Sequence, residues 1–168
     1  RKSPVDVATV QVTLLPPLYR SKLLKDFLFT PNINVLKQIT LEYCDDYDAL
    51  QTIITDGIGQ LTSLTKLNIN SCWQLASLPD SIGDLKSLTE LTLNWCENLT
   101  SLPERIGDLT SLTKLDLFKC KSLVSLPERI RECTSLTYLN LMYSPAGWNM
   151  PAALKAQLNN QGCSGPGW

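Results

Sequence analysis

The stretch "LFKCKSLVSLPERI", residues 117–130, decides how this chain folds, because it recurs. The chain reads "LNWCENLTSLPERI" at residues 93–106 and "INSCWQLASLPDSI" at residues 69–82, so the interval is 24 residues in both cases. A cysteine, a leucine and a Leu-Pro pair therefore return at one fixed spacing. Self-similarity at a period of roughly 20–50 residues is typical of stacked repeat architectures.

The same interval holds at many other positions, which form columns when the repeats are aligned. Each unit reads L-x-x-L-x-L-x-x-C-x-x-L-x-x-L-P-x-x-I-G-x-L-x-S. The columns are Leu64, Leu88, Leu112 and Leu136; Leu67, Leu91, Leu115 and Leu139; Ile69, Leu93, Leu117 and Leu141; Cys72, Cys96 and Cys120; Leu75, Leu99 and Leu123; Pro79, Pro103, Pro127 and Pro151; and Ile82, Ile106, Ile130 and Leu154.

Each part of the unit predicts a local structure. The L-x-L part alternates with period two, as a short strand with one buried face does. The Leu-Pro pair followed by I-G-x-L forbids a continuous strand and favours a tight helical turn that runs back. One unit alone cannot bury its leucines, whereas stacked units cover each other, so the pattern predicts a solenoid.

These columns resemble the leucine-rich repeat family in its form of 23 to 24 residues per repeat, with Cys in place of the usual Asn. The strict match covers residues 61–151. Among the family, the repeats are most similar to those of plant-type intracellular immune receptors. The resemblance implies an α/β repeat solenoid: a short horseshoe with about six parallel strands on the concave face, short helices or 3-10 turns on the convex face, and a C-terminal capping helix.

We expect a single leucine-rich-repeat domain over residues 1–168. Residues 1–35 form an irregular N-terminal coil with its strand at 7–12 and a helix near 19–29, and residues 36–60 form a second irregular coil. Residues 61–147 hold the regular repeats, and residues 148–168 a C-terminal helix and an irregular tail. The chain begins with Arg1 rather than Met, so it is left open whether it is a fragment or a processed form.

Composition argues against several classes of function. The net charge is −1 and the sequence contains no histidine, the commonest general base and metal ligand. No basic field attracts phosphates, and no apolar run approaches the roughly 20 residues that span a bilayer. We therefore expect no catalysis, no cofactor or metal, no nucleic-acid binding and no direct insertion into a membrane.

The cysteines are expected to be structural. Cys44, Cys72, Cys96 and Cys120 follow successive strands, and we predict a buried ladder of thiols that bond to backbone carbonyls, a role that Asn serves in most of the family. Thiols placed one per coil do not converge as the four ligands of a zinc site do. Cys133 is also expected to be buried, and Cys163, in the tail, to be the most reactive thiol.

The resemblance also bears on location, because extracellular members carry disulfide-rich caps that are absent here. We expect an intracellular protein, cytoplasmic or organellar.

Residues between the leucines are expected to point out of the concave face. Counted from the first leucine, the third position of three successive coils carries Lys66, Glu90 and Lys114, which are expected to neutralise each other across neighbouring strands. The fifth position carries small polar residues. Several large side chains occupy positions that the core does not require, and Tyr and Trp are enriched at binding hot spots. The alternative is that they pack sideways over neighbouring coils. The predicted partner-binding residues are Tyr43, Trp73, Trp95, Phe118, Tyr138, Met142 and Tyr143. The mixed charges of the convex face are expected to be solvated.

The function implied by the resemblance is a protein-interaction module that presents its concave sheet to a partner protein. One alternative is a structural subunit or spacer in a larger assembly, held by its edges or convex face. Another is the sensing end of a longer receptor-like chain. The identity of the partner, the oligomeric state and the face that binds are left open.

Overall fold

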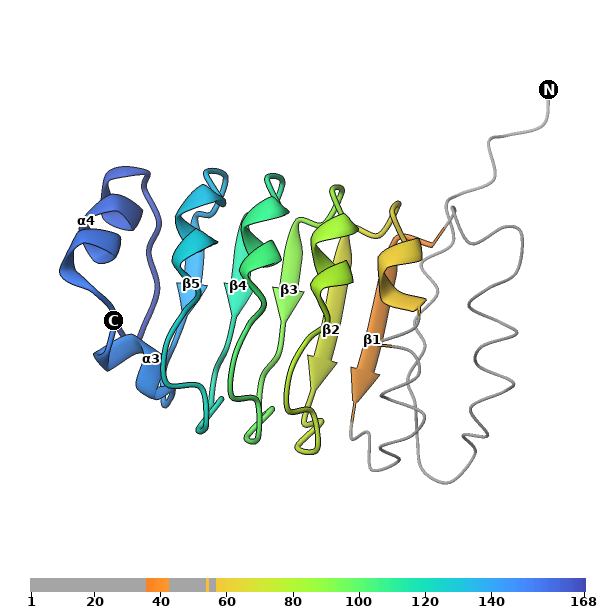
Figure 1. Cartoon of the computed structure of the whole chain (residues 1–168), viewed down its shortest axis with the longest axis horizontal. Helices are drawn as coiled ribbons and strands as arrows, with labels where there is room; N and C mark the ends of the chain where they lie inside the picture. The colour runs from red at the N-terminus through yellow and green to blue at the C-terminus, as the bar shows by residue number, and fades with distance from the viewer. Residues whose placement is uncertain (1–35, 43–53, 55–56) are drawn as a thin grey trace.

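The computed structural model describes residues 36–42, 54 and 57–168, and Figure 1 draws these residues as a row of coils that lie side by side. The strand expected at residues 7–12 and the helix expected near residues 19–29 lie outside the described residues. Each of the first four described strands is followed by one 3-10 helix, and the last strand is followed by two α-helices. The strands are β1 (Gln38–Glu42), β2 (Lys66–Asn70), β3 (Glu90–Thr92), β4 (Lys114–Asp116) and β5 (Tyr138–Asn140), and the helices are η3 (Ile58–Gln60), η4 (Asp80–Asp84), η5 (Glu104–Asp108), η6 (Glu128–Glu132), α3 (Pro145–Trp148) and α4 (Ala152–Asn160).

The five strands form one parallel sheet in the order β1-β2-β3-β4-β5. Glu90 of β3 lies opposite Lys66 of β2 and Lys114 of β4, so the register follows the 24-residue columns. The predicted solenoid with strands on one face and 3-10 turns on the other is confirmed. We refer to each coil by its strand, so that the β2, β3, β4 and β5 coils begin at the first leucine of each repeat, at residues 64, 88, 112 and 136.

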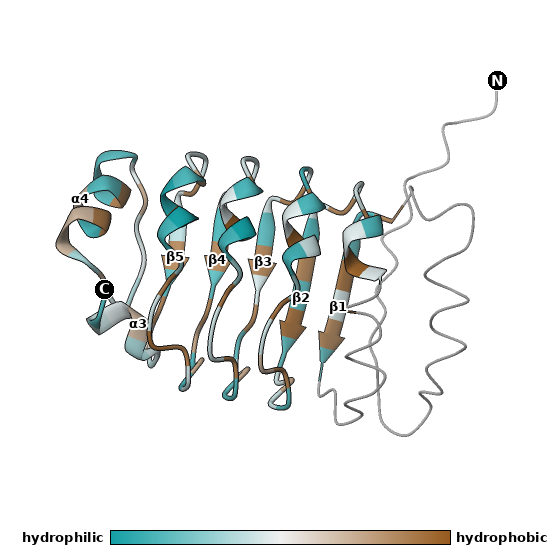
Figure 2. Ribbon diagram, in the orientation of Figure 1, coloured by the Kyte–Doolittle hydropathy of each residue, from teal (hydrophilic) through white to brown (hydrophobic). Residues whose placement is uncertain are grey.

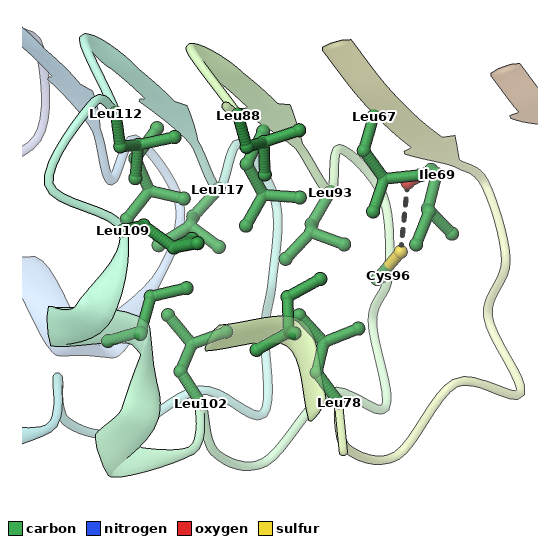
Figure 3. Close-up of a cluster of buried hydrophobic side chains, with 14 of the residues drawn as sticks. Leu67, Ile69, Leu78, Leu88, Leu93, Cys96, Leu102, Leu109, Leu112 and Leu117 are labelled. Atoms are coloured by element: carbon green, nitrogen blue, oxygen red, sulfur yellow. Dashed lines mark hydrogen bonds between the residues drawn. The ribbon is translucent and has the colours of Figure 1, made fainter. Parts of the chain in front are cut away.

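The leucine columns form a continuous core between the sheet and the row of 3-10 helices. Leu67, Leu91, Leu115 and Leu139, one from each coil, are all 0% exposed. Figure 3 shows the leucines of adjacent coils pointing toward one another, and Figure 2 shows polar residues concentrated on the outer 3-10 turns. Replacing one such buried leucine by alanine costs typically 2–5 kcal/mol, so every coil depends on its neighbours.

The spacing of the 3-10 helices is set by a glycine column. A Cβ placed on Gly83 or Gly107 would lie 2.6 or 2.5 Å from the backbone oxygen of Arg105 or Arg129, respectively, in the next coil. Glycine therefore permits the turns to pack with their backbones almost in contact. Arg131 occupies this column in the β4 coil, beyond which α4 replaces the 3-10 helix.

The charges of the convex face are exposed to solvent, as expected, and they also form ion pairs with one another. Arg105 pairs with Asp84 at 2.6 Å and with Asp108 at 3.0 Å, and Arg129 pairs with Asp108 at 2.7 Å and with Glu132 at 2.8 Å. Hydrogen bonds from the guanidinium of Arg129 and then of Arg105 lower the pKa of Asp108 below its usual value. The ion pairs run across the η4, η5 and η6 turns and connect three coils.

The predicted C-terminal helix is confirmed, whereas the course of the tail after it was not predicted. Helix α4 lies against η6 and buries Leu158. The tail then runs along the free edge of β5 (Figure 1), where Leu139 N donates to Ser164 O and Leu141 N to Pro166 O, each at 2.9 Å. The tail is therefore an edge cover and not irregular, and it satisfies backbone groups that an open edge would expose.

Candidate binding surface

The strands arrange small polar and charged side chains on the outward face of the sheet. Lys66 pairs with Glu90 at 2.6 Å, as the expected neutralisation of the third position requires. Lys114 does not join this pair, and its ammonium instead lies 5.5 Å from the centre of the Tyr138 ring. In the fifth position, the amide of Asn140 donates to the carboxylate of Asp116 at 2.9 Å, which gives the sheet a hydrogen-bonded polar floor.

A tight turn follows each strand and places large side chains at the rim of this floor. The eighth residue of the repeat, counted from its first leucine, lies in this turn. It has a positive φ in all four regular coils, at Ser71 (56°), Trp95 (62°), Lys119 (58°) and Tyr143 (61°). This left-handed conformation is unusual for residues other than Gly, Asn or Asp. The turn geometry requires the conformation in every coil, but it does not require a Trp, a Lys or a Tyr.

Three aromatic rings from successive coils contact one another, and we call Trp95, Phe118 and Tyr143 the aromatic row. The ring centroids of Trp95 and Phe118 are 6.0 Å apart at an interplanar angle of 69°, and those of Phe118 and Tyr143 are 5.6 Å apart at 76°. Edge-to-face pairs of this kind stabilise each other by about 0.5–1.5 kcal/mol beyond their buried area. The row is thus a semi-rigid apolar strip across the β3, β4 and β5 coils.

The ammonium of Lys119 lies against this row. It is 3.4 Å from the centre of the Trp95 ring, 5.5 Å from that of Phe118 and 5.8 Å from that of Tyr143. A cation over an aromatic face is attracted by the ring quadrupole, most strongly by that of Trp. The rings therefore hold one positive charge at a defined place on the rim.

On the other side of Trp95 is a shallow hollow lined by Ser71, Trp73, Trp95 and Glu97. The two indoles belong to neighbouring coils, and Glu97 forms an ion pair with Lys121 at 2.8 Å. The hollow is mostly apolar and open to solvent, as suits the side chain of a bound partner.

The structure places most of the predicted binding residues at the surface. Trp73, Trp95, Met142 and Tyr143 are 50%, 43%, 37% and 58% exposed, whereas Phe118 and Tyr138 are half-buried. The sideways packing that we considered as an alternative holds for Phe118, which contacts rings on both sides. Tyr138 lies at the opposite end of the strand with Lys114, and Tyr43 lies outside the described residues.

The cysteines that follow the strands face the core. Cys72, Cys96 and Cys120 are fully buried, and the thiols of Cys96 and Cys120 donate to Ile69 O at 3.3 Å and Leu93 O at 3.2 Å; the Cys96 bond is drawn in Figure 3. Burial raises the pKa of Cys120 to about 12 and that of Cys96 further. Cys44 lies outside the described residues.

Ser144 and Cys163 follow these cysteines in the C-terminal part of the chain. Ser144 continues the cysteine column, 24 residues after Cys120, and its hydroxyl donates to Leu117 O at 2.7 Å. The column spacing could have identified it. Cys163 is also buried, at 4% exposed, and burial raises its pKa, but Cys72, Cys96, Cys120 and Cys133 are 0% exposed, so its greater reactivity stays a prediction.

Within residues 36–42, 54 and 57–168, no three His, Cys, Asp or Glu side chains lie together as metal ligands do. In the same part of the chain, no helix is both long enough and apolar enough to cross a membrane. What the surface combines is a polar floor, an apolar strip and fixed charges, which are the elements of non-covalent recognition.

Comparisons with known proteins agree with this architecture. The model of the family described as "Leucine-rich repeat region" matches residues 24–158. No curated protein sequence matches the chain. Among solved structures, the leucine-rich repeat domain of the type III effector XopL is 22% identical with a TM-score of 0.57, and the match covers 79% of this chain and 53% of that one.

A leucine-rich repeat protein of Leptospira interrogans is 30% identical with a TM-score of 0.49 over 66% of this chain and 32% of that one. The chain thus spans about a third to a half of the length of these two proteins. Leucine-rich repeat domains are typical protein-interaction modules. The family model matches most of the chain, and the chain folds into stacked 24-residue coils. This chain therefore belongs to the leucine-rich repeat family.

Proposed function

We propose that the chain is a protein-interaction module that binds a partner protein with its concave sheet and performs no catalysis of its own. The partner-binding residues are the aromatic row together with Trp73, Tyr138, Met142 and Tyr43, the last of which lies outside the described residues. Binding uses the polar floor for hydrogen bonds and the rim aromatics as anchors.

The observation that carries this proposal is the occupancy of the left-handed turn position. A non-glycine residue in this conformation costs about 1–2 kcal/mol, and Trp95 and Tyr143 also leave 43% and 58% of their surface in water. The strained conformation is common to the turn of every regular coil, since Ser71 and Lys119 share it, but the turn does not require an exposed aromatic side chain. Strained and exposed aromatic residues are instead typical of contact sites, where they supply large contact areas at low cost in side-chain entropy.

The dimensions of the sheet agree with such a role. Five parallel strands at a spacing of roughly 4.8 Å make a floor about 20 Å wide. A standard interface buries about 800 Å² on each partner, so such a contact would extend from the floor onto the rim.

A second candidate function, attachment as a structural subunit, is favoured by a groove on the convex face. The groove lies between η6 and α4 and has a volume of about 350 Å³. Its lining is mainly apolar and consists of Leu126, Glu128, Arg131, Pro151, Ala153, Leu154 and Gln157. A partner seated there would hold the solenoid by its C-terminal end and leave the concave face free.

Capture of partners from the native source with matched variants distinguishes the two candidates. We expect Trp95→Ala to weaken capture of the recurring partner by about thirtyfold, since truncating a central aromatic anchor typically costs 2 kcal/mol or more. Trp148→Ala is the matched control, because Trp148 is 79% exposed but lies in α3, outside the sheet. Arg131→Ala probes the convex groove.

The proposal fails if Arg131→Ala releases the partner and Trp95→Ala does not, and the structural candidate then takes its place. Melting temperatures of all three variants show whether any loss of binding reflects unfolding. Because Trp95 lies at the rim, we expect its variant to melt within a few degrees of the wild type.

A further inference from the structure

The lysines of the concave face fall into two classes. Lys66 and Lys121 have carboxylate partners, Glu90 at 2.6 Å and Glu97 at 2.8 Å. Lys114 and Lys119 form no ion pair with any described residue, and both lie against aromatic rings instead. Both unpaired lysines belong to the β4 coil, so the positive charge that remains on this face is concentrated there.

The acidic side chain that the β4 strand contributes to this face forms no ion pair with either lysine. Asp116 lies between the two lysines in sequence but is only 8% exposed. Its carboxylate accepts from the amide of Asn140 at 2.9 Å and from the backbone N–H of Phe118 at 3.4 Å. Asp116 is thus a satisfied part of the floor, and the two ammonium groups are the charges offered to a partner.

The side chain of Lys119 is more strongly preorganised to bind an anion than that of Lys114. Its ammonium is 3.4 Å from the Trp95 ring centre, and the rings of Phe118 and Tyr143 lie within 6 Å. An ammonium has three N–H donors, and aromatic faces satisfy charge without consuming a carboxylate. The rings therefore restrict the motion of the side chain before binding, which lowers the entropy lost when a partner's acidic group accepts from it.

The surroundings restrict the kind of anion. Glu90 and Glu97 flank the β4 coil on its N-terminal side, and the whole chain has a net charge of −1. A long polyanion such as a nucleic acid, or an anionic bilayer, would meet these carboxylates and find no extended basic surface. The aromatic row beside Lys119 instead favours a short segment in which an acidic residue stands next to a large apolar one.

We infer that the β4 and β5 coils of the concave face bind an acidic peptide segment of the partner, with a carboxylate on Lys119 and a neighbouring apolar side chain on the aromatic row. A second acidic residue reaches Lys114 beside Tyr138. The two lysines are five residues apart along an extended strand and its turn, so their Cα atoms are separated by about 16 Å or less. This inference rests on the proposed function and adds the chemistry of the segment that is recognised.

Selection of random short peptides displayed on phage against the full chain tests the inference. We expect the enriched peptides to contain Asp or Glu next to Phe, Tyr, Trp or Leu. For a synthetic peptide of the enriched sequence, Lys119→Gln should raise the Kd about fivefold or more, and the wild-type affinity should fall as salt is added. Lys119→Arg, which keeps the charge, should retain most of the affinity.

Lys86→Gln is the matched control, because it removes the same charge from a lysine that pairs with Asp108 on the convex face. We expect it to change the Kd by less than about twofold, as is usual for an exposed charge away from a contact. The inference is overturned if no peptide is enriched or if the enriched peptides are neutral or basic. Equal effects of Lys86→Gln and Lys119→Gln, or binding only of a phosphorylated form of the peptide, also overturn it.

The same peptides separate this inference from the proposed function. If Trp95→Ala abolishes peptide binding and Lys119→Gln does not, the concave face binds partners but does not select acidic segments. If neither variant affects binding, both the inference and the proposed function are contradicted.

Discussion

At the scale of single residues, the cysteine column is explained by hydrogen bonds to the preceding coil. The thiols of Cys96 and Cys120 donate to carbonyls in the preceding coil, and the hydroxyl of Ser144 does the same at the end of the column. A small donor is required here because the chain turns inward and leaves these carbonyls without a strand partner. Cysteine meets the requirement and is also apolar enough to be buried.

The thiol at this position makes stability depend on alkaline pH. Burial raises the pKa of Cys120 to about 12, whereas a thiol in an unfolded chain titrates near 8.5. Below about pH 8.5 both states are protonated and the full stability is present. As pH rises from there toward 12, only the unfolded state loses its proton, so the free energy of unfolding falls by about 1.4 kcal/mol per pH unit for each such thiol.

Cys120→Ser removes this dependence for one coil. We expect the variant to fold, because Ser144 already fills the same role in the next coil, and to lose about 1.4 kcal/mol per pH unit less than the wild type above about pH 8.5. Urea unfolding under reducing conditions at a series of alkaline pH values measures the two slopes. Equal slopes would mean that the native thiol ionises and is not isolated from water.

At the scale of elements, the 3-10 turns stack as closely as they do because glycine recurs in them. Gly59, Gly83 and Gly107 each face the backbone or Cβ of the following turn within 3 Å of where their own Cβ would be. The glycines are not needed for a special φ, so the requirement is one of space between elements. The ion pairs of Arg105 and Arg129 then join the same turns on their outer side.

We expect Gly107→Ala to destabilise the stack by about 1–3 kcal/mol, because the added methyl can be accommodated only if the backbone of the next turn moves. Arg131→Ala, in the same column but at the end of the glycine run, should cost less than about 0.5 kcal/mol, since it alters only an exposed side chain. Thermal or denaturant melting measures both. A Gly107→Ala variant as stable as the wild type would contradict the close packing of the turns.

The elements of the regular coils could be predicted from the sequence, because each follows from a residue pattern repeated four times. The strands, the turns after Leu-Pro and the burial of Leu115 and Cys96 are of this kind. A threonine ladder was equally visible but was overlooked. Thr89, Thr113 and Thr137 each donate a side-chain hydroxyl to the carbonyl of the threonine one coil earlier, at 3.0 to 3.1 Å.

At the scale of the whole molecule, the course of the tail could not be predicted from the sequence. The tail Cys163–Trp168 has no column to define its register, and its docking on β5 depends on tertiary contacts such as the bond from Trp168 Nε1 to Leu139 O at 2.9 Å. The left-handed turns were also missed, because their occupants are not the glycines that usually signal a positive φ. The contact of Lys119 with three rings follows from that turn geometry and was missed with it.

The central claim is that a partner covers the concave face, and hydroxyl-radical footprinting of the captured complex tests it most directly. Radicals oxidise exposed Trp, Met and Tyr side chains, and the surface carries such reporters on the concave rim at Trp95, Met142 and Tyr143 and outside the sheet at Trp148. We predict that the partner slows oxidation of Trp95, Met142 and Tyr143 and leaves that of Trp148 unchanged. Protection of Trp148 with undiminished oxidation of Trp95 and Tyr143 would contradict the account.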